Sequence, residues 1–169
     1  MSRNLLMILL LVLTGCVDSA LPPPPLSHGT TKETITTRII VLQPGGKERE
    51  EDKELAPALL VGDYTRGDGY VRHHISLKKD GNFTCEVEGC RGTYGTASGV
   101  WTVEKQGVKL VDKKSAGQLK NRPPEILLIL CSTEKYFLVP DEHRAECIAE
   151  GLGSKYCFEK QPKLRSDGR

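Results

Sequence analysis

Six cysteines and four histidines are the residues whose types and spacing allow specific chemistry in this chain. One cysteine follows an apolar segment near the N-terminus, and the other five lie in the second half of the chain, at Cys85, Cys90, Cys131, Cys147 and Cys157. Thiols in an oxidising compartment form disulfides, and thiols near histidines can bind a metal ion. Five thiols permit two disulfides with one thiol left over, or a bridge to another chain.

Local pairing is the disulfide arrangement that the spacing favours. Cys85 and Cys90 lie at the end of a predicted strand and in the following loop, and Cys147 and Cys157 lie in a predicted helix and in the coil after it. We therefore expect the bridges 85–90 and 147–157, with Cys131 buried in an apolar strand. Because connectivity does not follow from a sequence, other pairings stay open.

A metal site built from His73, His74, Cys85 and Cys90 is the alternative. Adjacent strand residues point to opposite faces, so His73 and His74 are poorly placed to share one ion. Four residues separate Cys85 from Cys90, which is wider than the usual zinc spacing. We therefore expect neither a metal nor another cofactor.

Catalytic signatures are missing from the sequence. His143 stands beside Glu142 in a predicted helix, but no nucleophile with a defined partner lies near it. The chain also has no nucleotide-binding glycine loop, nucleophile elbow or zinc-protease helix. We therefore predict that the protein is not an enzyme.

The N-terminal segment has the features of an export signal. Arg3 supplies a positive charge, and residues 5–13 form an apolar run. This run is much shorter than the roughly 20 residues that a membrane-spanning helix needs. It stops at Cys16.

The residues Leu13-Thr14-Gly15-Cys16 resemble the lipobox of bacterial lipoproteins. The resemblance implies that residues 1–15 are removed and that Cys16 is acylated and anchors the mature chain to a membrane, facing outward. Val17 after the cysteine resembles the outer-membrane sorting pattern of cells with two membranes. A plain secretory signal is the alternative.

The segments that follow predict a stalk and one folded domain. Four consecutive prolines at 22–25 favour an extended spacer. We assign residues 16–54 to the lipidated cysteine, stalk and charged linker, residues 55–160 to a β-domain, and residues 161–169 to a disordered tail.

The β-domain is predicted from alternating apolar residues and turn signals. Asp80-Gly81 and Gln106-Gly107 mark two hairpins, the first as a two-residue type I′ turn. Residues 126–130 are apolar on both faces, which is typical of a covered strand. We expect a mainly β fold, an antiparallel meander that closes into a barrel or a sandwich, with a short helix near 141–152 that Asp141 caps.

Two quoted segments, "LVGDYTRGDGY" and "ISLKKDGNFTCEVEGCRGTYGTASGVWTVEKQGVKL", resemble a set of uncharacterised small β-domains exported by bacteria. Their shared features are a Gly-Asp-Gly turn, an Asp-Gly-x-Phe hairpin, a Gly-Cys-x-Gly-x-Tyr loop and a Gly-x-Trp strand. The resemblance covers about half of the chain. It implies a small β-fold and no particular activity.

The balance of charges in the chain argues against nucleic acid as a partner. The chain has 24 basic and 22 acidic residues, which gives no strong field for nucleic acid. We expect a lipid-anchored binding or structural accessory of the cell envelope that contacts a protein partner or a small ligand. One alternative is an inhibitor of a lytic enzyme such as lysozyme, because Ala97-Ser98-Gly99 resembles a loop of such inhibitors. The other alternative is an envelope protein whose function depends on a thiol or a metal ion.

Overall fold

The computed structural model describes residues 34–43, 47–120, 125–133 and 135–162. The predicted signal peptide, the lipidation site Cys16 and the proline stalk lie outside the described residues. The described part contains ten strands, one α-helix and two short 3₁₀ helices. The elements are β1 (Ile35–Leu42), β2 (Glu48–Leu55), η1 (Pro57–Leu59), β3 (Gly62–Gly67), β4 (Val71–Leu77), β5 (Asn82–Gly89), β6 (Gly92–Glu104), β7 (Gly107–Gly117), β8 (Glu125–Ser132), β9 (Lys135–Pro140), η2 (Asp141–His143), α1 (Arg144–Glu150) and β10 (Phe158–Lys160).

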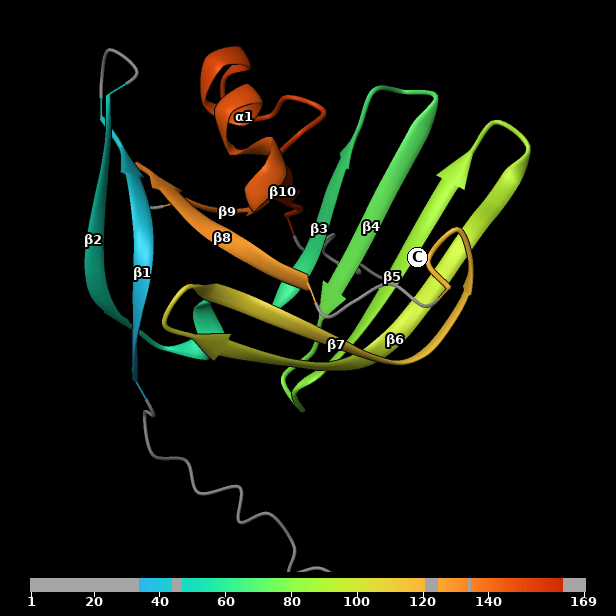
Figure 1. Ribbon diagram of the computed structural model, residues 1–169, viewed down its shortest axis with the longest axis horizontal. Helices are drawn as coiled ribbons and strands as arrows, with labels where there is room; N and C mark the ends of the chain where they lie inside the picture. Colours follow the sequence, from blue (N-terminus) through green and yellow to red (C-terminus); the bar gives the residue numbers. More distant parts are fainter. Residues whose placement is uncertain (1–33, 44–46, 121–124, 134, 163–169) are drawn as a thin grey trace, which may run out of the picture. The chain divides into compact units, whose positions relative to one another are not determined.

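Strands β3 to β10 form a closed antiparallel barrel of eight strands (Figure 1). Consecutive strands from β3 to β8 pair as a meander, and β10 then lies between β3 and β9. Pairing of β9 with β8 closes the ring. The prediction of a mainly β fold is therefore confirmed. Of the two predicted alternatives, the closed strand pairing shows that the domain is a barrel and not a sandwich.

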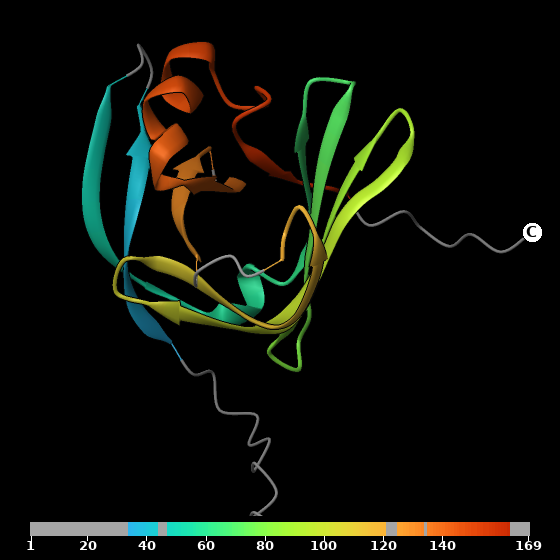
Figure 2. The same cartoon turned by 45° about the vertical axis from the view of Figure 1, so that its right-hand side comes forward.

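Strand β8 is where the barrel joins the first hairpin. One edge of β8 pairs with β9, while its other edge is shared. Residues 125–127 pair with β7, and residues 129–131 pair in parallel with β1. The β1–β2 hairpin therefore stands beside the barrel and does not form part of its wall (Figures 1 and 2).

The folded domain begins earlier than the predicted boundary at residue 55. The segment that we assigned to a charged linker forms β2, whose eight residues all pair with β1. Charged side chains are compatible with an edge strand because they stay in solvent while the backbone forms its hydrogen bonds. Arg144 of α1 also forms ion pairs with Glu48 and Glu50, at 3.1 and 2.7 Å, which attach the hairpin to the helix.

The barrel interior is filled by the inward-facing side chains of its strands. Phe83, Cys85 and Val87 of β5 are all buried, as the alternation predicts. Trp101 and Val103 of β6 are buried in the same way. These strands therefore confirm the predicted alternation between inner and outer faces.

A second apolar cluster lies outside the barrel, between its wall and α1. Leu130 of β8 and Val139 of β9 pack there with the buried disulfide of Cys147 and Cys157. Figure 2 shows the helix beside these two strands. The helix cover explains why residues 126–130 are apolar on both faces, and it confirms the prediction of a covered strand.

The first predicted hairpin forms, but with a different turn. Its loop spans residues 78–81, and the amide of Gly81 donates to the carbonyl of Lys78. Gly81 has φ 77°, whereas Asp80 is not among the described residues with positive φ. A type I′ turn needs positive φ at both central residues, so the predicted two-residue turn is wrong. The second hairpin turns at Lys105-Gln106, one residue before the predicted pair.

The C-terminal helix is shorter than predicted. A 3₁₀ turn at 141–143 precedes α1, and the side chain of Asp141 makes no capping hydrogen bond. The predicted cap is therefore wrong. Strand β10 was not predicted, because three residues are too few to show an alternating pattern. The amide of Gln161, in the predicted disordered tail, donates to the carbonyl of Asp63 at 2.8 Å.

The turn between β3 and β4 gives a testable pH dependence. The carboxylate of Asp68 accepts hydrogen bonds from the amides of Tyr70 and Val71, at 2.9 and 3.1 Å. These bonds, with that from Val71 the strongest cause, lower the pKa of Asp68. A lowered folded-state pKa stabilises the turn above the unfolded pKa, and this stabilisation is lost as the pH falls through the folded pKa. We expect the amide NMR signals of Tyr70 and Val71 to shift over that acidic range.

The variant Asp68→Asn is the matched control, because asparagine keeps an acceptor oxygen but does not titrate. Its Tyr70 and Val71 signals should show no such transition. An identical acidic transition in the variant would contradict the assignment to Asp68.

Candidate functional site

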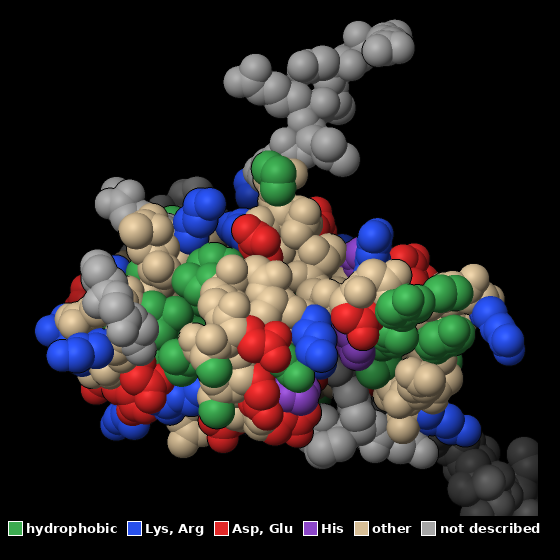
Figure 3. Space-filling view, turned by 90° about the horizontal axis from the view of Figure 1, so that it is seen from above, with side chains coloured by type: hydrophobic (Ala, Val, Ile, Leu, Met, Phe, Trp, Pro, Cys, Tyr) green, Lys and Arg blue, Asp and Glu red, His purple; other side chains and the backbone are tan. Residues whose placement is uncertain are grey.

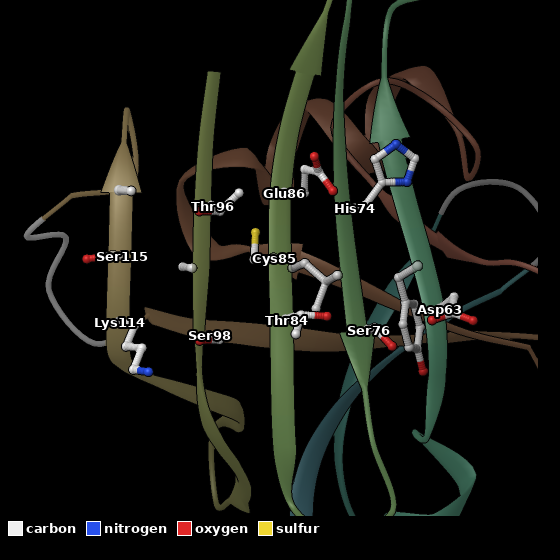
Figure 4. A pocket seen from close by; sticks show the side chains of 14 residues that line it. Asp63, His74, Ser76, Thr84, Cys85, Glu86, Thr96, Ser98, Lys114 and Ser115 are labelled. Atoms are coloured by element: carbon white, nitrogen blue, oxygen red, sulfur yellow. The ribbon is translucent and has the colours of Figure 1, made fainter. Parts of the chain in front are cut away.

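A groove of about 570 Å³ crosses the outer face of β3 to β7 (Figure 4). Strand register places five polar residues in one row across these strands. Asp63 pairs with Ser76, Ser76 with Thr84, Thr84 with Ser98, and Ser98 with Lys114. We call these five residues the polar row.

The polar row has opposite charges at its two ends. Asp63 of β3 and Lys114 of β7 are exposed, and three hydroxyl groups lie between them. Neighbouring strands are about 4.8 Å apart, so the row is about 19 Å long. The backbone positions of the row are fixed, since the strands of a closed sheet are hydrogen-bonded on both sides. The row therefore offers a series of hydrogen-bonding groups at fixed spacing that runs from an anion to a cation.

A second row lies beside the first and contains His74, Glu86 and Thr96. The hydroxyl of Thr93 donates to Oε1 of Glu86 at 2.7 Å. The His74 Nε2 atom lies 3.2 Å from Oε2 of Glu88. The carboxylates of Glu86 and Glu88 therefore already have partners on the sheet surface. The end residues of the polar row, Asp63 and Lys114, are more accessible.

The groove is suited to hydrogen bonding rather than to aromatic stacking. Apart from the imidazole of His74, Tyr64 is the only aromatic residue of the described lining, and its side chain is fully buried. Its hydroxyl donates to the carbonyl of Leu60 at 2.7 Å, and burial raises its pKa above the ordinary value. No hydrogen bond joins His74 to a serine or threonine hydroxyl among the described residues, so the groove shows no nucleophile and base in contact.

The predicted metal-site candidates are not brought together. His73 faces the barrel interior, where its ring lies edge-on to Phe158 with 6.5 Å between centroids, whereas His74 faces outward. Cys85 is buried inside the barrel, and Cys90 is exposed in the β5–β6 turn. Within the described ranges, no three His, Cys, Asp or Glu side chains are arranged to hold a metal ion.

The disulfide predictions have different outcomes. Cys147 and Cys157 are bonded, with 5.7 Å between their Cα atoms, which confirms that bridge. Cys85 and Cys90 are not disulfide-bonded, so the second predicted bridge is absent from the structure. The reason is geometric, because alternation turns Cys85 inward while the turn holds Cys90 in solvent. Cys131 is buried in β8, as predicted.

Two further sequence candidates are placed by the structure. The Nε2 atom of His143 lies 3.7 Å from Oε1 of Glu142, and its ring packs against Tyr156 at 5.2 Å. The segment Ala97-Ser98-Gly99, which resembles a loop of lysozyme inhibitors, lies inside strand β6. A register shift occurs between Ser98 and Gly99, and a Cβ atom on Gly99 would lie within 1.9 Å of the carbonyl oxygen of Val111. Glycine is therefore needed there to let β7 approach.

The residues of the polar row other than Ser98 were not singled out from the sequence. Each is an ordinary outward-facing strand residue, and alternation identifies it only as polar surface. Their common row depends on the register between five strands, for which no local signal exists.

Comparison with known proteins gave no match to a family model, to a curated protein or to a solved structure. No helix of the described part is long and apolar enough to cross a membrane.

Proposed function

We propose that this protein is a lipid-anchored component of the bacterial cell envelope that binds a polar ligand or a protein partner in the groove. The observation that carries the proposal is the polar row, in which an exposed carboxylate and an exposed ammonium group flank three hydroxyls in strand register. The lipid anchor rests on the lipobox-like residues that end at Cys16.

The packed interior supports binding on the outer face. Four residues from four different strands of the barrel are all fully buried in one core cluster, namely Phe83, Leu110, Ile129 and Leu138. A ligand inside the barrel would have to displace these side chains. The groove is instead open, and its charges and hydroxyls can pair with a polar molecule without any rearrangement of the core.

The anchor is tested in the native envelope. We expect the purified mature protein to begin at Cys16 and to carry acyl chains, as measured by intact-protein mass spectrometry. The variant Cys16→Ser should lose the acyl mass and leave the membrane fraction, because two or more acyl chains are needed for stable anchoring. An unacylated native chain that starts elsewhere would contradict the anchor and leave the groove proposal unaffected.

The groove is tested by photo-crosslinking in intact cells. A photoreactive amino acid at Ser98 should capture a defined partner or ligand, identified by mass spectrometry. Thr102 is the matched control, because it is exposed on the same strand but does not line the groove. The capture from Ser98 should also be lost in Asp63→Asn, Lys114→Gln protein. Equal capture from both positions, or no capture from Ser98, would contradict a binding role for the groove.

Inhibition of a lytic enzyme is the second candidate, and the position of Lys114 favours it. Lys114 pairs with Ser98 in the strand register and is an exposed residue. Glycoside hydrolases use a pair of carboxyl groups, against which an ammonium group can pair. A lysozyme activity assay should then show inhibition that Lys114→Gln weakens. Full lysozyme activity at high protein excess would eliminate this candidate.

A further inference from the structure

A second recess, of about 220 Å³, lies between the β3–β4 hairpin and the loop that the Cys147–Cys157 disulfide closes. Its lining includes Arg66, Arg72 and Ser154 together with glycines from both segments. We call it the arginine pocket. A water molecule occupies about 30 Å³ in the liquid, so the pocket has room for a small charged group and ordered water.

Arg66 is the unusual residue of this pocket. Its Nε atom is buried and has no hydrogen-bond partner. No ion pair or hydrogen bond joins its guanidinium group to another described residue, although the group lies 4.6 Å from the ring centroid of Phe158. Desolvation lowers the pKa of Arg66, and the more distant charges of Glu125 and Glu142 raise it. A half-buried cation without a direct anionic partner is costly, so it calls for an explanation.

Arg72 supplies a second cation to the same pocket. It pairs in register with Gly67, next to Arg66, and its side chain is exposed. Alternation turns Arg66 towards the barrel axis and Arg72 outward, and both line the pocket at the end of the hairpin. Arg72 likewise has no ion pair or hydrogen bond with another described residue. Both arginines line the same pocket and give its lining two positive charges.

The remaining polar groups of the lining define the charge of the pocket. Among the described residues of the lining, Glu159 is the only one with a carboxylate, and its Oε2 atom lies 3.9 Å from the point where a Cβ atom on Gly153 would stand. The hydroxyl of Ser154 lies 3.7 Å from the sulfur of Cys157 and can also donate to a ligand. The lining therefore carries an excess of positive charge.

We propose that the arginine pocket binds an oxyanion, either a carboxylate or a phosphate or sulfate group. Guanidinium groups bind planar and tetrahedral oxyanions through paired N–H donors, and such charge-assisted bonds are the strong ones. Figure 3 shows acidic, basic and histidine side chains side by side on one face of the molecule, so this face has no uniform charge. The site is separate from the groove.

NMR titration of the full chain with sodium phosphate, sodium sulfate and sodium acetate at constant ionic strength tests the proposal. We expect saturable shifts of the amide signals of Gly69, Gly153 and Ser154 with at least one of these anions. Tighter binding of phosphate or sulfate would identify that class of group, and tighter binding of acetate would identify a carboxylate. Saturation by none of the three would overturn the proposal.

Matched variants separate the pocket from general charge effects. Arg72→Gln should weaken binding about tenfold or more, because a charge-assisted hydrogen bond is lost. Lys79→Gln removes one positive charge in the β4–β5 turn and should leave binding unchanged. Glu159→Gln should tighten binding, since it removes the only carboxylate of the pocket. Equal effects of Arg72→Gln and Lys79→Gln would overturn the proposal, and both substitutions are at exposed residues that folding tolerates.

Discussion

Replacing Leu130 with alanine is expected to lower the free energy of unfolding by about 2–5 kcal/mol. Leu130 is fully buried on the outer face of β8, where it belongs to the apolar cluster under α1. The substitution removes buried methyl groups and leaves a cavity that the strand cannot close. Urea or thermal denaturation of the full chain measures the loss.

Two control substitutions make this result specific. Ile129→Ala removes a fully buried side chain from the other face of β8 and should cost a similar amount. Thr102→Ala, at an exposed position of β6, should change stability by no more than about 0.5 kcal/mol. A Leu130→Ala effect as small as that of Thr102→Ala would show that α1 does not cover this face in solution.

Removal of the Cys147–Cys157 disulfide should have an effect of comparable size. The double variant Cys147→Ala, Cys157→Ala should lose about 2–4 kcal/mol of stability. The bridge links residues ten apart in the sequence, and both cysteines are buried between the helix and the barrel wall. Without the bridge, the unfolded chain gains conformational entropy in the segment between the two cysteines, which lowers the stability of the folded state. The second apolar cluster also loses its covalent link.

Reduction of the native protein provides the control. A thiol reductant should lower the unfolding temperature of the native protein towards that of the double variant, whereas the variant should not respond. Because Cys85, Cys90 and Cys131 are not disulfide-bonded in the structure, their presence should not change this comparison. A reductant effect on the double variant would reveal a further bridge and contradict the observed thiol arrangement.

Local periodicity explains the parts of the fold that could be predicted. Phe83 and Val87 alternate with polar neighbours, and each inward position can be recognised without knowing the partner strand. The apolar residues 126–130 predict cover on both faces in the same way. Turn positions were less accurate, since the Asp80-Gly81 signal fits more than one turn geometry and the register of the strands selects between them.

The errors at the ends of the domain have a different physical cause. Strand β2 carries mostly charged side chains, so nothing in its composition distinguishes it from a solvated linker. Its pairing with β1 provides partners for its backbone hydrogen bonds, while its charged side chains stay in solvent. Strand β10 is three residues long, and only its position between β3 and β9 makes it part of the barrel.

The candidate sites depend still more on long-range arrangement. Asp63 and Lys114 lie 51 positions apart in the sequence and reach the two ends of one row only through four successive pairings. Arg66 and Ser154 line one pocket because β10 brings the disulfide-closed loop to the β3–β4 hairpin. No property of these residues taken singly predicts either arrangement.

The sequence by itself determined the β character of the domain, the inward faces of its longer strands and the presence of a helix near the C-terminus, because each depends on residues that are near in the chain. The tertiary structure alone decided the closure of the barrel, the separation of Cys85 from Cys90, and the assembly of the groove and the arginine pocket. These features depend on the register between strands, and register is set by the packing of the whole core rather than by any single segment.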